Sequence, residues 1–241
     1  MTGANPQYVI GVLGGMGPAA TVDFFNKLVQ STPAARDQEH RRVVIWSDPT
    51  VPDRTEALQG RAPDPTPWLL NGARRLQEIG ATHIAIPCNT AHAFVPSLAA
   101  RIGIPIVHMI DAVARRLSRG ASAVRRVGLL ATTGTVESGL YQVWLERRGI
   151  EVVFPPPGRQ AALMSAIRAI KGGRRGATEA QVLAAVADEL VAGAGAEAII
   201  AGCTEIPLCL TEEQVEVPLV DPARVLAEAI VELTSDVCAI R

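Results

Sequence analysis

The sequence has little cysteine and little histidine, with four residues of each among its 241 residues. The four cysteines, Cys88, Cys203, Cys209 and Cys238, are too sparse and scattered for a disulfide framework. Cys88 and His92 are four residues apart and Cys203 and Cys209 six apart, but no second closely spaced pair accompanies them, as a zinc site would require. We therefore expect neither disulfides nor a bound metal.

The sequence also lacks a strong net charge and a long apolar run. Its formal net charge of -1 gives no global reason to bind nucleic acid or an anionic membrane surface. No segment offers about 18 uninterrupted apolar residues, and residues 1–8 are too short and uncharged for a signal peptide. We expect a cytoplasmic protein without membrane association, whose thiols stay reduced. Hydrophobic residues are 48% of the chain and charged residues 20%, which is typical of a globular protein of one large or two small domains.

Short apolar runs alternate with longer amphipathic stretches along the chain. We expect strands over residues 8–13, 43–46, 83–87 and 104–110. We expect helices from Pro18 to about Gln30 and from Thr66 to Ile79, each with a proline close to its start. Unbroken apolar strands separated by helices predict an α/β fold whose parallel sheets are covered on both faces.

The same order of landmarks recurs in the second part of the chain. The matched pairs lie 117, 115 and 113 residues apart and are Gly11 with Gly128, Cys88 with Cys203, and Pro105 with Pro218. Parallel α/β proteins look self-similar in general, but three ordered matches favour an internal duplication. We therefore predict two similar domains related by a pseudo-twofold axis, one formed by 1–103 plus 217–241 and the other by 104–216. Such folds bind ligands beyond the carboxyl ends of their strands, which places the site in the interdomain cleft.

Two matched cysteines follow predicted strands, and each is the first residue of a polar cluster. These clusters are Cys88-Asn89-Thr90-Ala91-His92 and Cys203-Thr204-Glu205. A helix start beyond a strand stabilises a thiolate, and the following polar side chains can bind an anion. One thiolate could remove a proton from a carbon acid while a thiol on the opposite wall returns one, which inverts configuration. A single cysteine at a strand end is usually core packing, but a matched pair favours this catalytic role.

A glycine-rich stretch follows the first predicted strand. Gly15, Gly17 and Ala20 satisfy the loose dinucleotide fingerprint G-x-G-x-x-A, but Pro18 interrupts it and no clear acidic partner follows. The same stretch could cradle a substrate carboxylate with backbone amides, or it could simply be a tight turn. The sequence leaves these three uses open.

Two cations are candidates for binding a carboxylate. Arg54 lies in a proline-rich loop and could bind a carboxylate through two hydrogen bonds, although an arginine in a polar loop is often only solvated. Lys171 ends a helical run before two glycines, where a lysine also serves as an ordinary helix C-terminal residue.

At these residues the chain resembles the aspartate/glutamate racemase superfamily, and within it the aspartate racemases. The resemblance covers nearly the whole chain and is carried by the following segments: IGVLGGMGP (10–18), RDQEH (36–40), VPDRT (51–55), PCNTAHAF (87–94), GLLATTGT (128–135), AEAIIAGCTEIPL (196–208) and VPLVDP (217–222). It implies a two-domain α/β fold with the site between the domains, racemisation without pyridoxal phosphate or another cofactor, and a homodimer.

The resemblance also implies roles for individual residues. Cys88 and Cys203 would be the two acid/base groups, with Cys88 serving the D-enantiomer and Cys203 the L-enantiomer. Asn89 and Thr90 would hold the α-carboxylate and amino group, and Thr204 would do related work on the opposite wall. Arg54 and Lys171 would bind the distal carboxylate, and Met16 would line the pocket.

One departure helps to narrow the expected substrate. The glutamate racemases of cell-wall synthesis resemble this pattern but carry histidine where this chain has Glu205. The leading hypothesis is therefore a cofactor-independent aspartate racemase, with some turnover of glutamate. The alternatives are another isomerase of the superfamily, such as a hydantoin racemase or a maleate cis-trans isomerase, and a non-catalytic or NAD(P)-binding protein.

Overall fold

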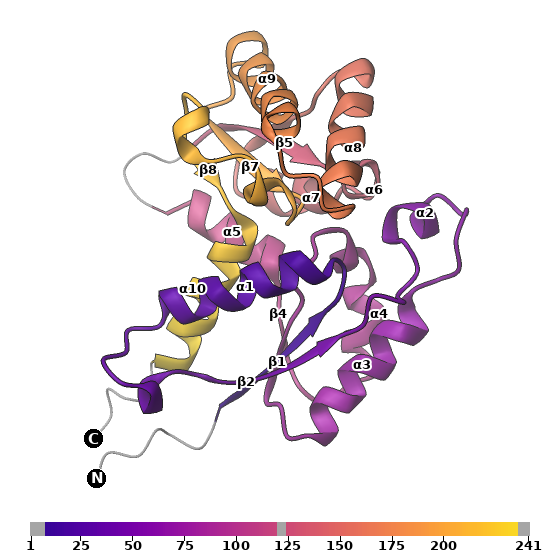
Figure 1. Ribbon diagram of the computed structural model, residues 1–241, viewed down its shortest axis with the longest axis vertical. Helices are drawn as coiled ribbons and strands as arrows, with labels where there is room; N and C mark the ends of the chain where they lie inside the picture. Colours follow the sequence, from indigo (N-terminus) through magenta and orange to yellow (C-terminus); the bar gives the residue numbers. More distant parts are fainter. Residues whose placement is uncertain (1–7, 120–123, 236–241) are drawn as a thin grey trace.

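The computed structural model describes residues 8–119 and 124–235, and Cys238 lies outside them. The described chain forms two parallel four-stranded sheets, each flanked by helices on both faces (Figure 1). The first sheet has the order β2 (Arg42–Ser47), β1 (Val9–Gly14), β3 (His83–Ala85) and β4 (Ile106–Val107). The second has the order β6 (Glu151–Val153), β5 (Arg126–Ala131), β7 (Ala198–Gly202) and β8 (Leu219–Val220). The two orders are equivalent strand by strand, which confirms the expected fold of two similar α/β halves.

The helices alternate with the strands along the chain. The α-helices are α1 (Pro18–Ser31), α2 (Arg54–Leu58), α3 (Thr66–Glu78), α4 (Val95–Ala99), α5 (Met109–Leu117), α6 (Thr133–Glu137), α7 (Leu140–Glu146), α8 (Pro157–Lys171), α9 (Ala177–Ala194) and α10 (Pro222–Ser235). The described residues also contain four short 3-10 helices: η1 (Asp37–Glu39), η2 (Thr90–Phe94), η3 (Ile206–Leu208) and η4 (Glu212–Gln214). Within the described residues, the structure contains no helix that is both long and apolar enough to cross a membrane.

Side chains of each central strand point alternately to the two helical layers, as strand geometry requires. In β1, Ile10 and Val12 pack against α1 and α10, whereas Leu13 packs against α3. In β5, Leu129 packs against α5 and α7, whereas Leu130 packs in the cluster formed with α8 and α9. Each sheet is therefore buried on both faces, which explains the unbroken apolar character of its strands.

The matched glycines lie where two layers approach closely. A Cβ added at Gly11 would come within 2.9 Å of Ala81, and one added at Gly128 within 2.6 Å of Ile199. Each glycine also lies against a helix: Gly11 against Leu76 of α3, and Gly128 against Leu190 of α9. The two glycines thus allow the same tight packing of a helix on the central strand in each half.

In the described residues, the chain crosses between the halves after β4 and after β8. At each crossing, the helix that follows the strand packs on the opposite half. The helix α5 follows β4 of the first sheet but packs in the core of the second half, and α10 follows β8 of the second sheet but packs on the first. The two crossing helices also contact each other. Figure 1 shows α10 beside α1, although these helices lie at opposite ends of the chain.

The structure corrects the expected strand over 104–110. Only Ile106 and Val107 pair with β3, because His108 already caps α5, accepting a hydrogen bond at Nδ1 from the amide of Asp111 at 3.3 Å. Strand β4 therefore belongs to the first sheet and β8 to the second, so residues 106–107 and 219–220 do not follow the boundaries placed at 103 and 217. The rest of the predicted division, 1–103 plus 217–241 and 104–216, stays a prediction.

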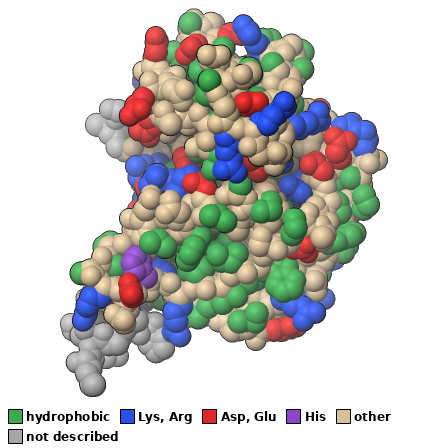
Figure 2. Space-filling view, in the orientation of Figure 1, with side chains coloured by type: hydrophobic (Ala, Val, Ile, Leu, Met, Phe, Trp, Pro, Cys, Tyr) green, Lys and Arg blue, Asp and Glu red, His purple; other side chains and the backbone are tan. Residues whose placement is uncertain are grey.

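Some apolar side chains remain outside both cores. Val22, Phe25 and Val29 form an exposed stripe along α1, and Ile45 of the edge strand β2 is also exposed. Figure 2 shows hydrophobic side chains gathered in this region of the first half.

Candidate active site

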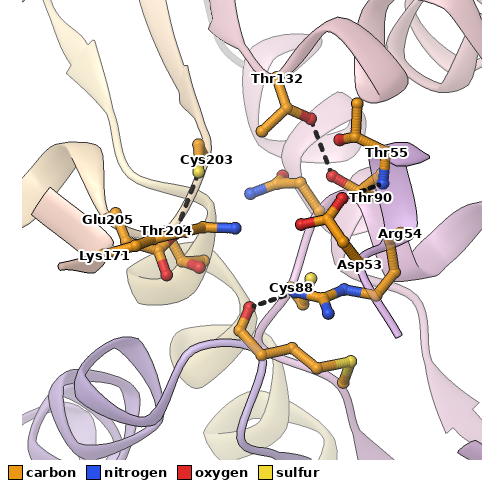
Figure 3. A pocket seen from close by; sticks show the side chains of 12 residues that line it. Asp53, Arg54, Thr55, Cys88, Thr90, Thr132, Lys171, Cys203, Thr204 and Glu205 are labelled. Atoms are coloured by element: carbon orange, nitrogen blue, oxygen red, sulfur yellow. Dashed lines mark hydrogen bonds between the residues drawn. The ribbon is translucent and has the colours of Figure 1, made fainter. Parts of the chain in front are cut away.

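A pocket between the two halves brings together all eight site residues that the sequence suggested. Cys88 and Cys203 lie just beyond β3 and β7, the equivalent third strands of the two sheets, and both are buried. The remaining six are Met16, Arg54, Asn89, Thr90, Lys171 and Thr204. Figure 3 shows residues from both halves facing this pocket. Their roles stay predictions, but these residues, which are far apart in the sequence, lie together in one pocket.

Four further residues line the same pocket: Asp53, Thr55, Thr132 and Glu205. Asp53 and Thr55 flank Arg54 at the start of α2, where the Asp53 carboxylate accepts hydrogen bonds from the amides of Thr55 and Glu56. Burial opposes ionisation of Asp53, but these amides together with the charges of Lys171 and Arg54 lower its pKa overall. All four lie inside or beside segments that the sequence analysis had singled out, yet only tertiary contacts reveal their position.

The buried carboxylate of Glu205 connects the two halves at the second cysteine. Its Oε2 accepts a hydrogen bond from the Cys203 thiol at 3.0 Å, and its Oε1 accepts one from the Gly17 amide at 3.2 Å. Burial raises the pKa of the Cys203 thiol and the charge of Glu205 raises it further, so that it lies well above its usual range despite the opposing charge of Lys171. Cys203 is therefore held as a protonated hydrogen-bond donor.

This contact also determines what the glycine-rich stretch does in the folded protein. Gly17 caps the start of α1, and its amide is occupied by the protein's own Glu205. The amide of Gly15, which has a φ of 91°, donates to the Thr21 hydroxyl at 2.9 Å. A Cβ on Gly17 would lie 3.0 Å from the Glu205 carboxylate. The stretch therefore serves as a close turn that accommodates an internal carboxylate.

Two buried donor atoms of pocket residues have no hydrogen-bond partner in the part of the chain that the structure describes. The buried Arg54 guanidinium donates to three backbone carbonyls, those of Val51, Pro52 and Met16, at 3.0–3.4 Å. Its Nε has no hydrogen-bond partner within residues 8–119 and 124–235, and neither does Nδ2 of the buried Asn89. Because a buried donor without a partner is costly, a ligand that brings hydrogen-bond acceptors to this pocket could offset the cost.

Lys171 adds a cation at the exposed side of the pocket. It ends α8, and no carboxylate of the described part of the chain lies within ion-pair distance of it. Burial lowers the pKa of Lys171, but interactions with the ionised forms of nearby acidic groups, Cys203 first and then Glu205 and Cys88, raise it, and the net direction is upward. Solvent reaches this side chain and weakens these interactions. Lys171 therefore stays protonated at the pocket.

Polar contacts across the cleft hold the halves together around the cysteines. The hydroxyls of Thr90, Thr132 and Thr135 lie 2.8–3.0 Å from one another, and the Tyr141 hydroxyl donates to Oδ1 of Asn89 at 2.6 Å.

The cavity left among the lining residues is about 10 Å³, which is room for about one water molecule. Binding of a ligand the size of an amino acid therefore requires the pocket to widen.

His92 supports the backbone of the first cysteine. Its Nε2 accepts a hydrogen bond from the Met109 amide at 3.1 Å, so the proton of the neutral ring lies on Nδ1, which donates to the Cys88 carbonyl at 2.9 Å. Burial and the neighbouring His108 lower the pKa of His92 to about 3. His92 thus acts as a fixed, neutral link between the Cys88 loop and the start of α5.

A metal centre is not apparent in the described ranges, which contain no group of three or more His, Cys, Asp or Glu side chains arranged to hold an ion. Cys88 and His92 contact each other through the cysteine carbonyl rather than through a shared ligand position. Cys209, which is only partly exposed, does not line the pocket.

Comparisons with known proteins agree on one family. The sequence profile described as Asp/Glu/Hydantoin racemase matches residues 13–230. The chain is 27% identical over 233 residues to the broad specificity amino-acid racemase RacX of Bacillus subtilis, a match covering 92% of this chain and 96% of that protein. It is similar in structure to Picrophilus torridus aspartate racemase, with a TM-score of 0.81, 32% identity and coverage of 95% and 94% of the two chains. A glutamate racemase from Francisella tularensis shares the fold, with a TM-score of 0.68, 21% identity and coverage of 96% and 82%.

The buried His92 provides a test of the site's geometry. Because its pKa in the folded state is about 3, we expect its imidazole signals in nitrogen-detected NMR spectra to stay unchanged between about pH 5 and pH 8. The unfolded chain takes up a proton at a higher pH than the folded one. The contribution of His92 to the free energy of unfolding is therefore lost as the pH falls from about 6.5 towards 3. The same titration in denaturant, where all histidines titrate near pH 6.5, is the control. A folded-state titration of His92 near pH 6.5 would contradict the hydrogen bonding described here.

Proposed function

The chain belongs to the Asp/Glu/hydantoin racemase family, and from this premise we propose that it interconverts L- and D-aspartate, with some turnover of glutamate, by proton transfer between two cysteines. The observation that carries the proposal is the pair of buried thiols at equivalent positions of two facing halves, in one pocket with Arg54 and Lys171. A carbon acid bound between the two cysteines would have a proton-transfer group on each side. The two cations are suited to a substrate with a second carboxylate.

The proposed reaction moves one proton at each face of the α-carbon. The thiolate of one cysteine removes the α-proton and becomes a thiol, while the thiol of the other cysteine donates its proton to the opposite face and becomes a thiolate. The electron pair left by the first transfer forms the new carbon–hydrogen bond, so configuration is inverted without an oxidant or reductant. The main barrier is the weak acidity of a carbon beside a carboxylate, whose developing negative charge needs positioned donors.

The donors needed at this barrier are those without partners in the pocket. Nδ2 of Asn89 and Nε of Arg54 are buried and available. The Thr90 hydroxyl lies beside Asn89 and already bonds to Thr132 and Thr135, which fixes its position. We assign Asn89 and Thr90 to the α-carboxylate and amino group, and Arg54 and Lys171 to the distal carboxylate. Thr204, whose hydroxyl donates to the Pro87 carbonyl at 3.3 Å, would support the opposite wall next to Cys203.

The two cysteines differ in their hydrogen bonding. The Cys203 thiol donates a hydrogen bond to Glu205, so we assign Cys203 as the acid of the first turnover and Cys88 as the base. With the assignment that the family resemblance implies, in which Cys88 serves the D-enantiomer, the resting protein is ready for D-aspartate. Glu205 is then a positioning residue that sets which half of the reversible reaction starts first. The expected homodimer and cytoplasmic location stay predictions.

The direct test of the proposed activity follows the α-proton. Purified protein is incubated with L-aspartate in D2O under reducing conditions without added cofactor, and loss of the α-proton signal is followed by NMR. We expect loss of this signal together with appearance of D-aspartate on a chiral column. Folded protein with free thiols that exchanges neither aspartate nor glutamate would exclude the proposed substrate and direct attention to another carbon acid acted on by the same cysteines.

Substitution of each cysteine tests the two-base mechanism. Because each turnover needs both thiols, Cys88→Ala and Cys203→Ala should each lower racemisation by at least about 100-fold, the lower end of what an acid or base contributes. Either variant can still exchange the α-proton of the single enantiomer that its remaining cysteine serves. Cys209→Ala is the matched control, since this cysteine lies outside the pocket and should leave the rate unchanged. Normal racemisation by either active-site variant would contradict the mechanism.

Replacement of the buried carboxylate tests the role of Glu205. Glutamine in Glu205→Gln can still accept the Gly17 hydrogen bond, but it removes the charge that raises the pKa of Cys203. For the enantiomer that Cys203 deprotonates, the pH profile of the exchange rate should therefore shift to lower pH. The profile for the opposite enantiomer should shift less. The measurement is the initial rate of deuterium exchange against pH for each enantiomer, with the exposed Glu213→Gln as control. Two unchanged profiles would show that the charge of Glu205 does not set the proton affinity of Cys203.

A further inference from the structure

A second cavity continues outward from the active pocket. It has a volume of about 190 Å³ and shares four wall residues with the inner pocket: Asp53, Thr55, Thr132 and Lys171. Its remaining walls come from Glu56 of α2 and from Met164, Ile167 and Arg168 of α8. The outer cavity is much larger than the space of about 10 Å³ around the cysteines. A ligand held at the inner pocket therefore has unfilled space beyond Lys171.

One face of α8 contributes both apolar and cationic side chains to this cavity. Residues 164, 167, 168 and 171 are spaced three, four and seven positions apart, so they share one face of the helix. The Met164 sulfur accepts a hydrogen bond from the Thr133 amide at 3.3 Å, which holds this flexible side chain against the wall. Met164 and Ile167 offer an apolar surface, and Arg168 adds a cation on the same face. Methionine adapts to varied ligand shapes, which suits a wall that contacts methylene groups.

The charges around the outer cavity favour an anion. Asp53 accepts two backbone hydrogen bonds at the start of α2, and Glu56 binds Arg61 through both oxygens at 2.7 and 3.1 Å. Arg168, by contrast, lies 3.9 Å from Glu56, at the limit of an ion pair. The acids at this cavity are thus satisfied by other groups, whereas Arg168 and Lys171 keep free hydrogen-bonding capacity.

We propose that the outer cavity is a side-chain subsite, which admits acidic amino acids with side chains longer than that of aspartate, up to at least the six-carbon 2-aminoadipate. The methylene groups would lie along Met164 and Ile167, and the distal carboxylate would reach Arg168 instead of stopping at Lys171. This inference rests on the proposed racemase function, because the α-carbon must still lie between Cys88 and Cys203.

A bulky substitution on α8 tests whether side chains enter the cavity. Met164→Trp fills the space next to Ile167, whereas Ser165→Trp places the same bulk on an exposed position of α8 that lines neither cavity. The measurement is kcat/KM for α-proton exchange with 2-aminoadipate and with aspartate. In Met164→Trp the ratio of the two values should fall by at least about 10-fold, the range that a lost methylene contact supports. Ser165→Trp should leave the ratio unchanged.

A charge substitution provides a second measurement that does not depend on a bulky side chain. Arg168→Gln should raise KM for 2-aminoadipate several-fold while KM for aspartate stays the same, because only the longer substrate reaches this residue. Equal slowing of both substrates by Met164→Trp would show that the cavity is an entrance only and would overturn the proposal. Exchange of aspartate but not of 2-aminoadipate by the unsubstituted protein would also overturn it and leave the proposed function intact. Exchange of no acidic amino acid would exclude the proposed function and, with it, the subsite.

Discussion

The polar contact between the two halves is the constraint on which the site depends, because residues beside each cysteine satisfy their hydrogen bonds in the opposite half. Thr204 donates to the carbonyl just before Cys88, and Glu205 accepts from Gly17 at the start of α1. In the other direction, Asn89 accepts from Tyr141. Buried polar groups must be paired, so neither loop can take this position without the other half. The same contacts that close the cleft therefore also bring the two thiols to one pocket.

This closure explains why the cleft is both narrow and polar. Most hydroxyl and carboxylate groups at the cleft are already paired with the protein, and the donors left over are nitrogen atoms of Arg54, Asn89 and Lys171. An anion that enters can satisfy these donors, but it must first widen a space of about 10 Å³. The free energy of binding then offsets the loss of cross-cleft hydrogen bonds, each of which contributes about 1 kcal/mol net. Recognition of the substrate and opening of the cleft are coupled through the same residues.

Much of the fold could be predicted from sequence because the periodicity of its strands and helices is local. The duplication was visible in glycine, cysteine and proline landmarks, and the equivalent strand orders agree with it. The strand expected over 104–110 exists but was predicted too long, because Met109 and Ile110 are apolar through their burial on α5 rather than on a strand. The contact of Glu205 with Gly17 joins residues 188 positions apart, so no local pattern reveals it. The glycine-rich stretch was ambiguous for the same reason, because its partner comes from the opposite half.

The two cysteines have equivalent positions in the fold but unequal surroundings, which bears on the proposed two-base proton transfer. If the two cysteines had identical neighbours they would have the same proton affinity, and the state with one thiol and one thiolate would have no preferred arrangement. Here a carboxylate holds the proton on Cys203, whereas the support at Cys88 is the neutral His92 bound to its backbone carbonyl. The duplication supplies two thiols in matching positions, and the side chains around them favour Cys203 as the first acid of the proposed reaction. The asymmetry between Glu205 and His92 therefore gives the proposed reaction a defined starting state, while the shared fold keeps it reversible.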